Sequence, residues 1–123
     1  MAKKIKCIVK RPDEQFGHVT WVSDSLENLQ KTVGGYIETV TLPEHNLVLI
    51  CNDEGKIRDM PYNFSTLCSA HAHDAYVEWI EWRIEFREAL YGTVIACGVE
   101  GDEFADIQID FNEWKSLLCE WGN

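Results

Sequence analysis

The sequence has no long apolar run. Residues 1–6 lack the apolar stretch of a signal peptide, and no window approaches the ~20 apolar residues that span a membrane. The five cysteines include no C-x-x-C pair, and Cys7, Cys51 and Cys97 lie inside apolar runs. These absences predict a cytoplasmic protein with reduced cysteines and no membrane partner.

Basic residues are scarce. The chain has 11 lysines and arginines against 21 aspartates and glutamates, which gives a net charge of −10 over 123 residues. Five of the bases lie in residues 1–11, so the rest of the chain is more acidic than the total indicates. Such a charge repels nucleic acid and anionic lipid and attracts basic protein surfaces. The composition therefore disfavours direct nucleic-acid binding.

Recognisable catalytic motifs are also absent. The chain has no G-x-S-x-G elbow, no Walker lysine loop and no H-E-x-x-H pair. Cys68, His71 and His73 gather metal-ligand types in one short segment, but no second ligand pair follows with zinc spacing. Structural zinc normally takes four protein ligands. We therefore expect a protein that is not an enzyme and that holds no metal or other cofactor.

What the chain does contain indicates one α+β domain over residues 1–123. Apolar residues make up 46% of it, enough for a core, and no linker divides it. A helix is predicted where Asp24 and Glu27 have capping-box spacing and Gly34 follows the last apolar residue. Around an antiparallel or mixed sheet we predict strands at 5–9, 18–22, 36–42, 47–51, 56–58 and 92–99, and helices at 25–33, 70–90 and 111–121.

The predicted helix at 70–90 carries the most acidic and aromatic surface. Residues 82–87 alternate like a strand, but the longer window fits a helix. In that helix four glutamates share one face without an arginine at helical spacing to compensate them, and two tryptophans lie beside them. This face is either solvated or a partner-binding surface with aromatic anchors. Its residues are Glu78, Trp79, Glu81, Trp82, Glu85 and Glu88.

A second candidate site is a ligand pocket on the predicted hairpin. Tyr36 and Glu38 are two residues apart on a strand and share a face. With Asn52 or Asn63 beside them, a ring and a carboxylate could hold a base or a sugar. The same pattern is also typical of a half-buried sheet face, so both interpretations stay open.

Residues 29–38, LQKTVGGYIE, resemble the V-G-G-Y-I-E signature of a small uncharacterised domain family that is associated with phages and mobile elements of Gram-positive bacteria. Further similar segments follow in the family's order at 52–56, 60–63 and 91–95, whereas Phe64 stands where the family often has arginine. The resemblance covers roughly residues 4–110. It implies a compact α+β domain in a mobile-element setting and no established activity.

Together these observations predict a non-catalytic accessory protein of a phage or mobile element, acting in the host cytoplasm. We expect it to inhibit a host defence factor, such as a nuclease, by presenting its acidic, aromatic surface to a basic nucleic-acid site. The alternative is a protein that binds and sequesters a nucleotide signal at Tyr36, Glu38, Asn52 and Asn63. A minor hydrolase or a structural component is a third possibility, and the sequence leaves the oligomeric state open.

Overall fold

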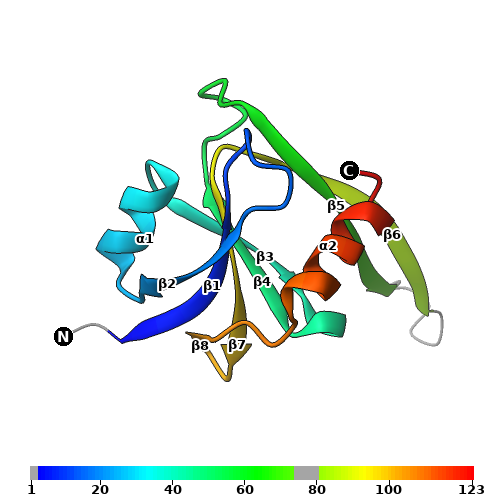
Figure 1. Ribbon diagram of the computed structural model, residues 1–123. Helices are drawn as coiled ribbons and strands as arrows, with labels where there is room; N and C mark the ends of the chain where they lie inside the picture. The colour runs from blue at the N-terminus through cyan, green and yellow to red at the C-terminus, as the bar shows by residue number, and fades with distance from the viewer. Residues whose placement is uncertain (1–2, 74–80) are drawn as a thin grey trace.

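The computed structural model describes residues 3–73 and 81–123, with the backbone alone for 68–73 and 81–86. Its centre is a six-stranded sheet in the order β2-β1-β7-β4-β3, with β8 beside β7 (Figure 1). All of these pairs are antiparallel. The predicted α+β fold is confirmed. The strands are β1 (Lys4–Lys10), β2 (His18–Ser23), β3 (Ile37–Leu42), β4 (Leu47–Asn52), β7 (Val94–Glu100) and β8 (Glu103–Ala105).

Both faces of the sheet are covered. Helix α1 (Leu26–Val33) packs on one face, and α2 (Phe111–Glu120) packs on the other (Figure 1). All six residues of β4 are buried, because a strand between two covered faces contributes both sets of alternating side chains to the core. The strand predicted at 47–51 and the helix predicted at 111–121 are confirmed. No helix in the described ranges is long and apolar enough to cross a membrane.

Helix α1 begins one residue later than expected. The Ser25 side-chain oxygen accepts a hydrogen bond from the Asn28 amide at 3.1 Å, so Ser25 caps the helix and the prediction of Asp24 was wrong. At the other end Gly34 has φ +84°, a left-handed conformation that is costly for other residues. This confirms the predicted end of the helix, and the chain then turns into β3.

The predicted helix at 70–90 was wrong. The chain forms a hairpin of β5 (Tyr62–His73) and β6 (Glu81–Tyr91), which projects from the main sheet beside α2 (Figure 1). Residues 74–80 lie outside the described chain. Between 81 and 87 charged and apolar residues alternate one by one, which is the period of a strand. The longer window also fits a helix, but pairing with residues 62–73 gives the backbone of this segment a partner strand and favours the strand.

The strand predicted at 56–58 was also wrong. Residues 53–59 form successive turns, in which the Arg58 amide donates to the Glu54 carbonyl at 2.8 Å and the Met60 amide to the Gly55 carbonyl at 3.0 Å. Local hydrogen bonds therefore replace a sheet partner. Between β3 and β4 the chain forms a short 3-10 helix, η1 (Pro43–His45).

Three aromatic side chains join the hairpin to the C-terminal helix. The Phe64 ring stands edge-on to Trp114 at 5.7 Å and stacks on Trp121 at 6.1 Å. Trp114 is fully buried, and its indole Nε1–H donates to the Phe16 carbonyl at 2.7 Å. This cluster holds β5 against α2, and it positions the base of β6 beside the main sheet.

Candidate functional site

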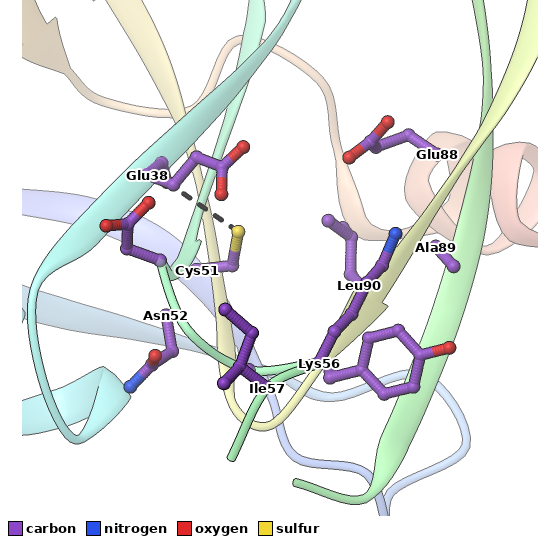
Figure 2. Close-up of a pocket in the computed structure, with 11 residues that line it drawn as sticks. Glu38, Cys51, Asn52, Lys56, Ile57, Glu88, Ala89 and Leu90 are labelled. Atoms are coloured by element: carbon purple, nitrogen blue, oxygen red, sulfur yellow. Dashed lines mark hydrogen bonds between the residues drawn. The ribbon is translucent and has the colours of Figure 1, made fainter. Parts of the chain in front are cut away.

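A cleft of about 220 Å³ lies between the β3–β4 edge of the main sheet and β6 of the hairpin (Figure 2). Glu38 of β3 and Cys51 of β4 are direct cross-strand partners and line one side. The segment from Glu88 to Tyr91 lines the other side. Asp53, Gly55, Lys56 and Ile57 of the turn segment complete the wall, so the cleft is built from β3, the stretch 51–57 and the stretch 88–91.

The turn that completes the cleft is held by Asn52. The Asn52 side-chain carbonyl accepts a hydrogen bond from the Glu54 amide at 2.7 Å, and its side-chain amide donates to the Val33 carbonyl at 3.1 Å. Gly55 then approaches β6 so closely that a Cβ there would lie 3.1 Å from the Tyr91 Cβ. A side chain at this point would be crowded against Tyr91, because the turn backbone lies directly against the hairpin.

The charge of the cleft is negative. Its walls carry the carboxylates of Glu38, Asp53 and Glu88, and Lys56 is the one base among the described lining residues. Figure 2 shows Glu38 and Glu88 on opposite sides of the cleft. The Lys56 ammonium lies 5.9 Å from the centre of the Tyr91 ring. A cation between the two glutamates would meet opposite charge from both sides.

Cys51 is the thiol of the cleft. Burial, together with the negative charges of Glu38, Glu88 and Asp53, raises the pKa of Cys51 to about 11. Its Sγ–H donates to the Glu38 carbonyl at 3.7 Å (Figure 2). The thiolate is the nucleophilic form, so a thiol that stays protonated at neutral pH is unsuited to nucleophilic catalysis.

We expect peptide-resolved alkylation at neutral pH to label Cys119 much faster than Cys7, Cys51 or Cys97. Cys119 is exposed, whereas burial raises the pKa of Cys7 and Cys97 to about 12. A pKa two units above that of an ordinary thiol lowers the thiolate fraction about a hundredfold. Iodoacetamide labelling followed by mass spectrometry measures the rates. Equal rates for Cys51 and Cys119 would contradict the protonated state of the cleft thiol.

The four residues of the predicted ligand pocket do not form one site. Glu38 and Asn52 line the cleft, whereas Tyr36 is 71% exposed and lines a neighbouring hollow with Asn52 and Arg58. Asn63 is buried elsewhere, where its side-chain carbonyl accepts from the Lys10 ammonium at 2.6 Å. Its side-chain amide donates to the carbonyls of Lys10 and Gly92. The contacts of Asn63 are those of a structural residue.

The predicted acidic face is divided by the hairpin. Glu88 lines the cleft, opposite Glu38. Glu81, Trp82 and Glu85 lie in β6, in the part where the structure describes the backbone alone. Glu78 and Trp79 fall outside the described residues altogether. The cleft is therefore lined by one glutamate from each of the two predicted sites, Glu38 from the ligand pocket and Glu88 from the acidic face.

Sequence reasoning missed most of the lining residues. Asp53 was noticed only within the family-like segment 52–56, and Lys56 within that segment and the predicted strand at 56–58. Cys51 and Tyr91 were noticed only as parts of apolar or family-like segments. The alternation in residues 81–87 was the available signal, because a strand there requires a partner strand and so a hairpin. Even so, it would not have shown which edge of the main sheet the hairpin approaches.

The fold and the cleft define a small α+β domain whose acidic cleft lies between a sheet edge and a projecting hairpin. The chain belongs to the family described as a domain of unknown function, DUF3846, whose model matches residues 5–118. No curated protein and no solved structure matches the chain. The matched region contains nearly the whole sheet, the hairpin and most of α2, and it includes every residue that lines the cleft.

Proposed function

We propose that the protein binds a basic protein surface and that the acidic cleft takes a lysine or arginine side chain of the partner. The observation that carries this proposal is the position of Glu38 and Glu88 on opposite sides of the cleft. Carboxylates that flank a cation form strong charge-assisted hydrogen bonds, especially with the planar guanidinium of arginine. The inserted side chain acts as the anchor of a larger interface.

The apolar part of the cleft suits the stem of such a side chain. Ala89 and Leu90 of β6 and Ile57 of the turn line the cleft below the carboxylates, and Ile57 is 87% exposed. Lysine and arginine place their methylene groups on apolar surface while the charged group reaches polar partners. An exposed isoleucine next to an acidic cleft becomes buried when such a partner docks.

The charges disfavour the alternative of a nucleotide signal. Three carboxylates against one ammonium repel phosphate, and Asn63 is engaged by Lys10 in the interior. Tyr36 and Glu38 also line different hollows. A basic protein partner is therefore the better explanation of the site.

The partner that we propose is a host defence factor with a basic nucleic-acid site, such as a nuclease, which the protein inhibits in the host cytoplasm. Two observations support this: the net charge of −10 and the sequence resemblance to phage and mobile-element domains. An acidic protein competes with nucleic acid for a basic site through long-range attraction.

The test replaces both cleft carboxylates at once, as Glu38→Gln with Glu88→Gln. We expect a fluorescent arginine-rich peptide to bind about tenfold more weakly, a loss of ~1.4 kcal/mol, with a smaller salt dependence. The matched control is Glu100→Gln with Glu103→Gln, which removes the same charge from the β7–β8 turn. Equal weakening by both pairs would show that only the total charge matters, and would reject the cleft as the site.

Inhibition of host defence is tested in cells and in lysate. Wild-type protein is expected to capture a nucleic-acid-binding protein from host lysate at low salt and to raise the plating efficiency of a defence-sensitive phage. The cleft double variant should lose both effects while its thermal unfolding is unchanged. If the protein captures a basic protein but plating does not change, the proposed binding is supported and the proposed inhibition of defence is rejected.

A further inference from the structure

The far edge of the main sheet carries an open strand. β2 is the terminal strand at the end opposite β3, so this edge is remote from the cleft. Lys6 pairs with Trp21, but the Lys6 amide donates to the Asp106 carboxylate at 2.9 Å and its carbonyl accepts from the Ile107 amide at 2.8 Å. Lys6 thus directs its backbone groups away from Trp21.

The backbone groups of Trp21 therefore point outward. In an antiparallel pair, hydrogen-bonded and non-hydrogen-bonded positions alternate, so Val19 and Trp21 both present N–H and C=O to the free edge. Beyond them the Ser23 carbonyl is already bonded to Ser25 and Asn28. No strand in the described chain pairs with this side of β2. The outward N–H and C=O groups of Val19 and Trp21 therefore have the spacing needed to pair with a further β-strand.

This edge lacks the features that normally prevent association. The strand HVTWVS contains no proline, lysine or acidic residue, and its register with β1 is continuous. Trp21 is 58% exposed and Val19 is 43% exposed, and residues two apart share a face. A large indole at an open edge becomes buried only when another chain adds to the sheet.

Lysines flank the exposed indole. Lys6 is the direct cross-strand partner of Trp21 and Lys4 pairs with Ser23, so both lysines lie on the face of Trp21. Both lysine side chains are exposed. An acidic protein thus has a basic, aromatic strip along an open strand.

We propose that the β2 edge binds an extended acidic segment of a partner protein, which adds to the sheet as a further strand. Its backbone pairs with Val19 and Trp21, its apolar side chains cover Trp21, and its carboxylates meet Lys4 and Lys6. A second copy of this chain would instead bring its own Lys4 and Lys6 against the same strip, so like charges would meet there. The backbone template selects a polypeptide over a nucleic acid.

The test uses a capped peptide of alternating valine and glutamate, with a valine–lysine peptide as the control probe. Val19→Pro removes one outward N–H that β1 does not use, whereas Val19→Ala keeps it. We expect Val19→Pro to weaken binding of the acidic peptide at least about tenfold and Val19→Ala about twofold or less. Lys4→Gln with Lys6→Gln should weaken it and reduce its salt dependence.

A second measurement needs no variant. On the wild-type protein, the acidic peptide should slow amide hydrogen exchange at Val19 and Trp21, and leave it unchanged at Glu38, whose strand is at the other edge. Unchanged exchange at Val19 and Trp21, or equal binding of both peptides, would overturn the proposal. So would a wild-type dimer in sedimentation that Val19→Pro converts to monomer, because the occupant would then be a second copy.

Discussion

Replacing Asn63 with leucine is expected to lower the free energy of unfolding by about 3 kcal/mol, because it leaves several buried polar groups without partners. Asn63 accepts from the Lys10 ammonium at 2.6 Å and donates to the carbonyls of Lys10 and Gly92 at 2.8 and 2.7 Å. Lys10 is itself buried, and burial lowers its pKa below the ordinary value. Leucine keeps the size of the side chain but supplies none of these contacts.

Urea unfolding followed by circular dichroism measures the loss, and Asn112→Leu is the control. Asn112 is exposed on α2, so the same change there should cost less than about 0.5 kcal/mol. Adding Lys10→Met to Asn63→Leu should recover part of the loss, because the unpaired ammonium is then removed. If Asn63→Leu costs no more than the control, Asn63 is not the residue that ties β1 to the hairpin.

Trp114→Ala is expected to be at least as damaging, with a loss of about 4 kcal/mol. The indole is fully buried, donates to the Phe16 carbonyl and packs against Phe64 and Trp121, so alanine leaves a cavity and an unsatisfied carbonyl. Because Phe64 lies near the start of β5, the cavity should also loosen the packing of the hairpin against the main domain.

The matched control is Trp21→Ala, which removes the same side chain from an exposed position on β2. We expect it to change the unfolding free energy by less than about 0.5 kcal/mol. Trp114→Phe should fall between the two, since it retains a ring but loses the indole N–H. A Trp114→Ala protein as stable as Trp21→Ala would contradict the aromatic cluster as the link between hairpin and helix.

Local signals in the sequence predicted most elements of the main domain. The helix before Gly34 and the terminal helix have apolar residues at helical spacing and residues suited to their ends. The hairpin of β3 and β4 is bounded by turn residues, and its second strand is continuously apolar because both sheet faces are covered. In each case residues that are close in sequence are enough to predict the helix or strand.

The β5–β6 hairpin could not be assigned in the same way. Its residues satisfy both a helical pattern over the long window and a strand pattern over a short one, and such windows are ambiguous without a partner. The strand at 56–58 failed for the opposite reason. Its residues have strand propensity, but local hydrogen bonds to Glu54 and Gly55 satisfy the backbone without a sheet.

The sequence by itself determined the net charge, the absence of known catalytic motifs, the α+β composition and the identity of the acidic residues. Only the tertiary structure decided which of these residues meet. Glu38 and Glu88 were candidates for different sites, and they line one cleft because the hairpin lies against the β3–β4 edge. The open edge at Val19 and Trp21 likewise depends on the order of strands in the sheet. Contacts between segments distant in sequence arise from packing, and no local pattern encodes them.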